Sequence, residues 1–259
     1  MCIRDSLCSA HETRRFHVVA DSAHGGQNVL AKLPAKCDLT SRLLLAARLY
    51  GVRPERVPGT NGRPRKRGQR LSSPADMLAG QCRRVSLSIY GRSYRSRITD
   101  QVARVFAVPD RPLRVVASEA LEGGRGTEAF YSTCHEATAE QVIRWYAMRW
   151  SVEVTFRDSK QCLGFEEPQG WSRKAVERTA PLAMLLHTLV VLWLAKEGHR
   201  LWQPPTRRWY PGKADPSFRD MLHTLRRASV RQHVLAMAPT GRGSRKLARL
   251  LEHAVAMAA

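Results

Sequence analysis

The spacing of apolar residues changes along this 259-residue chain, and the change limits the folds open to it. Before about Ala137, short apolar runs with strand-like composition are separated by turns and by one basic loop. From Ala137 to about Leu163 the spacing is helical, and further helices are expected at residues 174–197 and at Phe218–Met237. A chain of this length can bury a substantial core. We therefore expect an α/β protein with a mostly helical C-terminal part.

The first apolar run, Phe16–Ala20, ends at Asp21. A turn containing Gly25 and Gly26 follows, and then an expected helix at residues 27–33. A strand with a polar end, a glycine turn and a helix together begin an α/β unit. Asp21 is a candidate functional residue at this strand end. The alternative interpretation is that it only shapes or caps the turn.

The region after this unit is expected to be rich in strands. A second strand is expected at residues 41–49, and Gly, Pro, Arg and Lys dominate residues 51–76, which we interpret as an extended basic loop with little packing of its own. Further strands are expected at residues 85–90, 102–108, 113–117 and 129–133.

The chain carries a large excess of positive charge. Its 43 Lys and Arg against 22 Asp and Glu leave a formal net charge of +21. Such an excess is usually matched by a polyanion, although a generally adhesive or ribosome-associated basic protein would show it too. The six cysteines form no CxxC pair, which argues against a zinc ribbon and a disulfide framework and favours reduced thiols in the cytosol.

A long apolar run occupies residues 181–195. It is short for a bilayer and contains His187, which we expect to be a hydrogen-bonded core residue. The chain also starts without the apolar segment of a signal peptide. We therefore expect a buried helix and no membrane partner.

The most informative segment is the expected helix at residues 145–160. At about 100° per residue, one arc of roughly 80° collects an aromatic hydroxyl, a carboxylate and three cations: Tyr146, Arg149, Glu153, Arg157 and Lys160. A neighbouring arc holds the expected core-facing residues: Trp145, Met148, Val152, Phe156 and Leu163. Phosphates could lie along the cations while the carboxylate binds a metal ion. The alternative is a solvated helix with ordinary (i, i+4) ion pairs.

The spacing Tyr146-x2-Arg149-x3-Glu153-x6-Lys160 resembles the Y-R-E-K signature of DDE transposases from bacterial insertion sequences. The flanking words resemble that family as well: RWSVEVTFRDSKQCLGFEEPQ, AVERTAP, HVVADSAHGG and GRPRKRG. The resemblance covers residues 16–193.

This resemblance implies an RNase H-like core, a mixed sheet flanked by helices. A β-rich insertion would precede the last catalytic helix, and a helical part would end the chain. The implied regions are a partial core at residues 1–49, the insertion at 50–128 with its basic loop at 59–70, the rest of the core at 129–197, and a basic helical region at 198–259.

The resemblance also implies a metal-dependent reaction. Asp21 matches the second family aspartate and Glu153 the third carboxylate, which together would hold Mg²⁺, with Mn²⁺ as a substitute. Tyr146, Arg149 and Lys160 match positions that contact phosphates near the transposon end, and Arg157 shares their face. The implied function is cleavage and strand transfer of double-stranded transposon DNA. A homodimer assembled on DNA, in the bacterial cytoplasm at the nucleoid, is also implied.

The chain departs from the family pattern at its start. The first aspartate should lie well upstream of Asp21, but only Asp5 precedes it, with 15 residues between them. A parallel crossover needs roughly a dozen residues, so Asp5 is a poor candidate. We expect a chain that lacks this carboxylate and is weakly active or inactive, with the opening MCIRDS as a junction. The alternatives are an inactive remnant that only holds DNA, and an unrelated basic nucleic-acid-binding protein.

The basic loop supplies a second candidate DNA contact. Residues 62–68 resemble an AT-hook core, in which an extended Arg-Pro segment enters the minor groove. The DNA-binding cations would be Arg63, Arg65, Lys66 and Arg67. A charged, solvated loop is the alternative. His11, His17 and His24 surround Asp21, but their spacing does not match a usual zinc site.

Overall fold

The computed structural model describes most of the chain: residues 8–11, 13–55, 59, 63, 65–89, 91–122, 126–204, 212–237, 250 and 253. Two compact units make up the fold, Met1–Trp150 and Ser151–Ala259. Asp5 lies outside the described residues.

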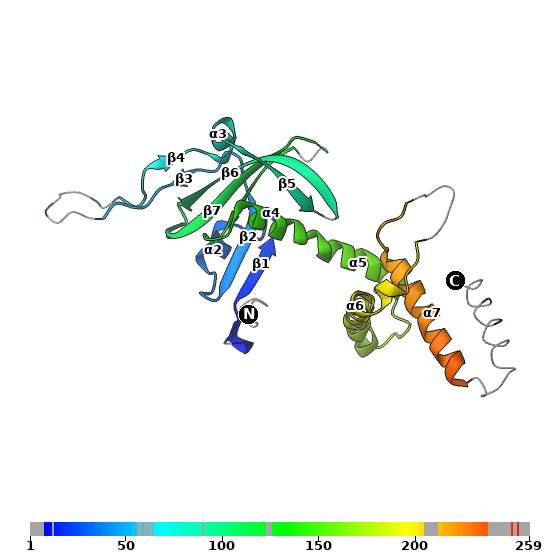
Figure 1. The fold of residues 1–259 in the computed structure, drawn as a ribbon. Coiled ribbons are helices and arrows are strands. Elements are labelled where there is room, and N and C mark those ends of the chain that lie inside the picture. The colour runs from blue at the N-terminus through cyan, green and yellow to red at the C-terminus, as the bar shows by residue number, and fades with distance from the viewer. Residues whose placement is uncertain are drawn as a thin grey trace. The chain divides into compact units, whose positions relative to one another are not determined.

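A mixed sheet of eight strands forms the first unit, in the order β1-β2-β8-β7-β6-β3-β4, with β5 paired to β6 (Figure 1). The strands are β1 (Phe16–Ala20), β2 (Cys37–Leu43), β3 (Leu49–Tyr50), β4 (Arg70–Leu71), β5 (Arg83–Ile89), β6 (Arg92–Val105), β7 (Val108–Ala120) and β8 (Thr127–Ser132). β1 and β2 are parallel, whereas β2 and β8 are antiparallel. The strands of the expected insertion therefore continue the same sheet as the Asp21 strand.

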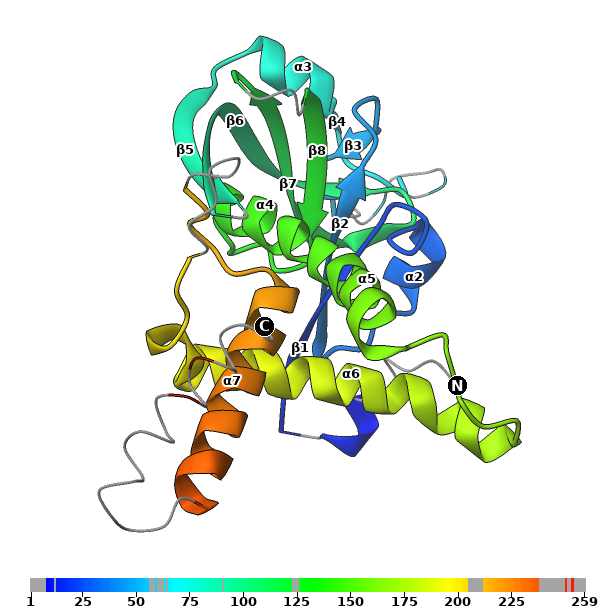
Figure 2. The same ribbon diagram turned by 90° about the vertical axis from the view of Figure 1, so that its right-hand side faces the viewer.

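Two hydrophobic clusters cover the two faces of this sheet. Alternate residues of a strand point to opposite faces, and Val115 and Tyr131 belong to one cluster while Val116 and Phe130 belong to the other. Helices α2 (Gln27–Ala31) and α3 (Pro74–Ala79) contribute to the first cluster. Helix α4 (Ala139–Met148) contributes to the second and lies against the sheet in Figure 2. This arrangement confirms the expected α/β class.

Two local expectations between β2 and β5 are wrong. The strand expected at residues 41–49 ends at Leu43, because the Ala47 amide closes a turn onto the Leu44 carbonyl, and β3 begins only at Leu49. The loop expected at residues 51–76 contains β4 and the start of α3. A Ser73–Asp76 capping box starts α3, and burial of Met77 stabilises it.

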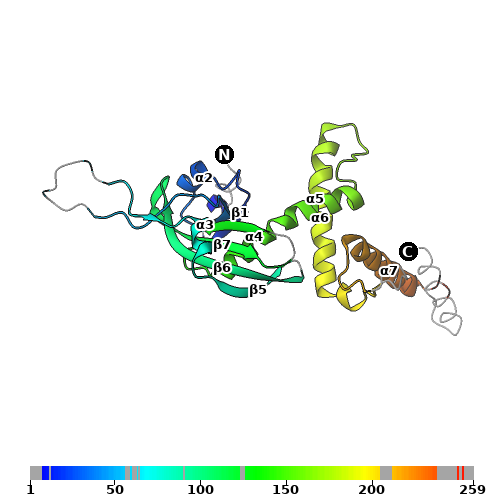
Figure 3. The same cartoon turned by 90° about the horizontal axis from the view of Figure 1, so that it is seen from above.

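Helices form the second unit. After α5 (Trp150–Leu163) come α6 (Arg173–Lys196), a short 3-10 turn η1 (Gly198–Arg200) and α7 (Phe218–Met237). Figure 3 shows α7 beside α6, and the His187 ring stacks on Phe218 with a centroid distance of 4.3 Å. Burial lowers the pKa of His187, which favours a neutral ring at neutral pH. The helices expected at 174–197 and Phe218–Met237 are confirmed.

Helix α6 is less buried than the sequence indicates. Ala183, Val190 and Leu194 are buried, but the opposite side exposes five leucines by 41–55%: Leu182, Leu185, Leu186, Leu189 and Leu192. Apolar residues surround the helix, and α7 packs on one side of it. By length and composition α6 would also pass as a membrane span, with 17% of its apolar window buried, which is weak evidence because core helices meet the same criterion.

Candidate functional site

The turn that carries Asp21 is fastened to the neighbouring strands. The backbone carbonyl of Asp21 accepts hydrogen bonds from the Gly25 amide and the Ser41 hydroxyl, both at 2.9 Å. The hydroxyl of Tyr131 donates to the Gly25 carbonyl. Burial raises the pKa of that hydroxyl, which keeps it protonated as a donor. Strands β2 and β8 thus hold the end of β1, where the Asp21 side chain is 46% exposed.

Polar side chains link the same three strands next to this turn; Thr40 and Ser132 are buried, whereas His17 is at the surface. His17 Nε2 lies 2.8 Å from Thr40 Oγ1, and Thr40 Oγ1 donates to Ser132 Oγ at 2.9 Å. The His17 ring also packs against Trp145 of α4, with a centroid distance of 4.2 Å. Burial lowers the pKa of His17, so the neutral ring is favoured. Packing and hydrogen bonds thus fix the strands next to Asp21 relative to one another and to α4.

One neighbour dominates the surroundings of the Asp21 carboxylate. Its Oδ1 accepts hydrogen bonds from the His24 backbone amide at 3.0 Å and from His24 Nδ1 at 2.9 Å. These bonds, with a smaller contribution from the positive charge of Arg149, hold the pKa of Asp21 below its usual value. The carboxylate is therefore ionised at neutral pH. From the sequence, His24 was considered only as a zinc ligand, and this contact was not predicted. The Asp-x-x-His spacing in a turn could have indicated it.

Gly25 makes the close approach of the turn to β2 possible. A Cβ added at Gly25 would lie 2.0 Å from Ser41 Oγ and 2.4 Å from Ser41 Cβ. Gly25→Ala is therefore expected to displace the turn and destabilise the first unit by about 1–3 kcal/mol, the usual cost of overpacking. Gly25→Ala/Ser41→Gly should recover part of this loss, because the clashing atoms are gone. Urea unfolding of the single and double variants measures both, and a double variant no more stable than Gly25→Ala would contradict the steric explanation.

The helix that carries the remaining candidates is interrupted where one continuous helix was expected. Helix α4 ends at Met148 and α5 begins at Trp150. Arg149 between them has helical angles, φ −53° and ψ −37°, and its amide donates to the Tyr146 carbonyl at 3.1 Å. The Tyr146 ring packs on Phe130 at 4.7 Å, and the Arg149 guanidinium lies 5.9 Å from the Tyr146 ring centroid. The first unit thus places Arg149 where its charge acts on Asp21.

The expected core-facing stripe of this segment is wrong in part. Met148, Val152 and Phe156 are 63%, 55% and 40% exposed. The buried residues of α4 instead lie on another side of the helix, namely Ala139, Val142, Ile143 and Ala147. At about 100° per residue, Met148 falls on the far side of α4 from these buried residues, so the stripe drawn through Met148 does not match the packed face.

The other candidates of the Y-R-E-K pattern belong to the second unit. Glu153 lies in the first turn of α5 and is half-buried. Arg157 pairs with Asp158 at 2.9 Å, and Lys160 pairs with Glu166. Asp21 belongs to the first unit, so its approach to Glu153 remains a proposal.

Metal binding by these residues is a question of donor chemistry. Within the described part of the chain, no group of three or more His, Cys, Asp and Glu side chains gathers closely enough to hold an ion. Mg²⁺, however, usually keeps several waters and takes one or two carboxylates together with phosphate oxygens. An ionised, half-exposed carboxylate at a strand end fits that role, so Asp21 is a suitable donor.

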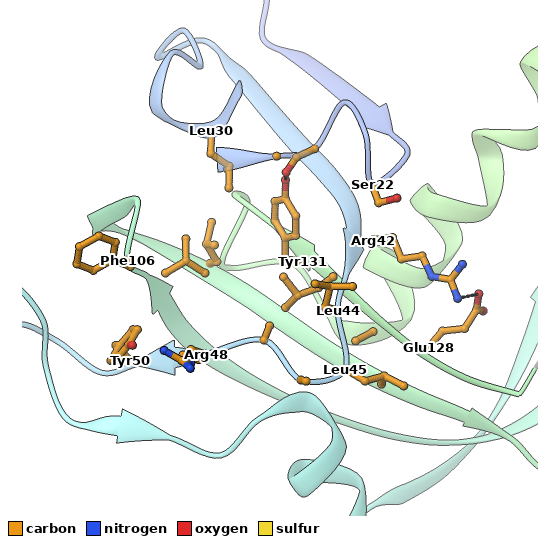
Figure 4. Close-up of a pocket in the computed structure, with 18 of the residues that line it drawn as sticks. Ser22, Leu30, Arg42, Leu44, Leu45, Arg48, Tyr50, Phe106, Glu128 and Tyr131 are labelled. Carbon is orange, nitrogen blue, oxygen red and sulfur yellow. Dashed lines mark hydrogen bonds and ion pairs between the residues drawn. The ribbon is translucent and has the colours of Figure 1, made fainter. Parts of the chain in front are cut away.

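A cavity of about 1010 Å³ lies beside the Asp21 turn in the first unit (Figure 4). Its lining includes Gly25 and Gly26 of the turn, and Arg42, which pairs with Glu128 at 3.4 Å. At the other side of the cavity, Arg67 donates to the Tyr50 hydroxyl at 2.7 Å, and its guanidinium lies 5.3 Å from the Phe106 ring centroid.

Arg67 thus differs from the other three cations of the basic loop. It contacts Tyr50 and Phe106, which ties the loop to the sheet at its base. All four cations are exposed, so these contacts and not burial set Arg67 apart.

A family model described as a transposase DDE domain matches residues 4–189. A search of curated proteins returns no match. The matched segment contains Asp21, Arg149, Glu153 and Lys160, and it extends through the sheet, α4, α5 and most of α6.

Proposed function

The chain belongs to the family of transposase DDE domains, and we propose that it cleaves and joins DNA ends with Asp21 and Glu153 as two of its metal-binding carboxylates. The family establishes a transposase function in general, an α/β fold of the RNase H-like class and DNA as the partner. The ionised carboxylate of Asp21 at the exposed end of β1 carries the finer proposal.

The proposed chemistry is phosphoryl transfer, for which the chain has to position DNA and hold negative charge at one point. A bound divalent cation would activate the attacking oxygen and stabilise the leaving oxygen. Asp21 and Glu153 would each offer carboxylate oxygens, the donors that Mg²⁺ prefers. Mn²⁺ would substitute, since it accepts the same oxygen donors.

Two observations support a shared site for Asp21 and Glu153. The charge of Arg149 acts on Asp21 within the first unit. Glu153 follows Arg149 by four residues, about one helical turn, and the backbone of Arg149 itself has helical angles.

The cations near these carboxylates would hold the DNA backbone. Arg149, Arg157 and Lys160 are suited to phosphate oxygens, and Tyr146 can donate a hydroxyl hydrogen bond. Arg157 and Lys160 pair with Asp158 and Glu166 in the protein alone, so binding DNA would exchange carboxylate partners for phosphates.

The shared site can be tested through the metal alone. Binding of Mn²⁺ to the full chain can be measured from the electron paramagnetic resonance signal of the free ion. The affinity should be lower in both Asp21→Asn and Glu153→Gln. Loss of either carboxylate should weaken the same single site, so each variant should keep the wild-type number of bound ions at a lower affinity. Wild-type affinity in Asp21→Asn would remove the proposal, and the loss of one bound ion in each single variant, with the other ion bound as tightly as before, would indicate two separate sites.

A second candidate function is that of a protein that holds DNA without cleaving it. It is favoured by the excess of positive charge, a formal +21, which attracts a polyanion without any metal ion. DNA binding that is normal without added Mg²⁺, with no cleavage when Mg²⁺ is added, is the result that distinguishes it. In either case we propose a DNA-bound homodimer at the bacterial nucleoid.

The basic loop gives a further prediction. Replacing Arg63, Arg65 and Lys66 together by Ala should weaken DNA binding and flatten its salt dependence. Each lost phosphate contact lowers the magnitude of the slope of log K against log salt concentration by about 0.9. The magnitude of this slope should therefore fall by up to about 2.7 in the triple variant. Fluorescence anisotropy with one duplex at several salt concentrations measures the slope. Arg53→Ala, which removes an exposed cation paired with Asp110, is the control, and an unchanged slope in the triple variant would show that the loop is merely solvated.

A further inference from the structure

The Asp21 carboxylate is held unevenly. Both hydrogen bonds recorded for it end on Oδ1, and both come from His24, one from the backbone amide and one from Nδ1. Among the described residues, none forms a hydrogen bond with Oδ2. One oxygen is therefore held by two hydrogen bonds, and the side chain as a whole is 46% exposed at the strand end.

The ring of His24 is separate from the contacts that build the turn. The turn is closed by the Gly25 amide and the Ser41 hydroxyl, which bind the Asp21 carbonyl, and by the Tyr131 hydroxyl. The His24 side chain is 82% exposed and therefore adds little packing. Removing the ring should leave the turn and the backbone hydrogen bond of His24 in place.

We propose that His24 is a positioning residue that fixes Oδ1 of Asp21 through its Nδ1–H, so that Oδ2 is presented to a divalent cation. This inference rests on the proposed role of Asp21 as a metal ligand. Side chains that hydrogen-bond a ligating carboxylate orient it, and their loss typically lowers metal affinity by 10–100-fold. The role requires a hydrogen on Nδ1, which the ring supplies in one neutral tautomer or as the imidazolium.

A hydrogen-bond donor can be kept at the position of Nδ1 without the imidazole ring. The side-chain amide nitrogen of Asn lies at nearly the same distance from the backbone as Nδ1 and also donates. His24→Asn should therefore preserve the hydrogen bond that His24→Ala removes. His11→Ala, at an exposed histidine of the same unit, is the matched control.

The experiment is an Mn²⁺ titration of the full chain, read by electron paramagnetic resonance, with thermal unfolding of each variant in parallel. We expect His24→Ala to weaken Mn²⁺ binding by about 10–100-fold, His24→Asn to restore it to within a few-fold, and His11→Ala to bind as the wild type. The unfolding midpoints of all three should match the wild type.

The outcomes separate this inference from the proposed function. If Asp21→Asn weakens Mn²⁺ binding but His24→Ala does not, Asp21 remains a ligand and the positioning role of His24 is overturned. If His24→Asn binds as weakly as His24→Ala, the donor at Nδ1 is not what matters, and the inference is likewise overturned. If Asp21→Asn binds Mn²⁺ as the wild type does, the proposed function itself fails.

Discussion

Replacing Asp21 by Asn, or Glu153 by Gln, is expected to lower the Mg²⁺-dependent cleavage of DNA, which we expect to be weak in this chain, by up to about a thousandfold. Metal ions contribute several kcal/mol of charge stabilisation to the transition state of phosphoryl transfer. A loss of about 4 kcal/mol corresponds to about three powers of ten in rate. Each substitution keeps the shape of the side chain while removing its negative charge, so DNA affinity should be unchanged or slightly higher.

The measurement is cleavage of a duplex that carries the terminal repeats flanking the coding sequence, with DNA binding determined on the same duplex. Two matched controls remove a carboxylate elsewhere: Asp110→Asn in the first unit and Glu177→Gln in the second. Asp110 pairs with Arg53 and Glu177 with Arg173, both at exposed positions. Controls that lose as much cleavage as Asp21→Asn would show a general charge effect. Equal cleavage by wild type and Glu153→Gln would exclude Glu153 from the site.

Replacing Phe130 by Ala is expected to destabilise the first unit by about 3–5 kcal/mol, the usual cost of deleting a buried phenyl ring. Phe130 is 2% exposed and belongs to the cluster between the sheet and α4. Its ring also packs on Tyr146 at 4.7 Å. The cavity would remove support from Tyr146 and, through the same helix, from Arg149, so DNA binding should weaken as well.

Hydrogen exchange of the β7 and β8 amides, measured with increasing urea, reports on the first unit separately from the second. Phe106→Ala removes the same ring from a site that is 55% exposed and contacts Arg67, and it should cost about 1 kcal/mol or less. Equal losses in the two variants would contradict the placement of Phe130 in the core.

The sequence predicted those elements whose signals are local. Phe16–Ala20 is a short, mostly apolar run followed by Asp21 and a glycine turn, and it forms β1 at the expected residues. The helix Phe218–Met237 also matches its expected bounds, because a long periodic segment specifies a helix without help from distant residues. α3 was missed because its six residues are too few for periodicity, and its cap and buried Met77 decide its formation.

The same distinction applies to the candidate site. Residue types and spacing made Asp21 and the Tyr146–Lys160 pattern candidates, because metal and phosphate chemistry requires particular donors, and the resemblance to DDE transposases favoured them over the turn and solvated-helix interpretations. Only the tertiary structure decided that Arg67 binds Tyr50, and that His24 and Arg149 act on Asp21. It also decided that Met148 and Val152 are exposed. These outcomes depend on which residues meet across the fold, and spacing along the chain does not encode those contacts.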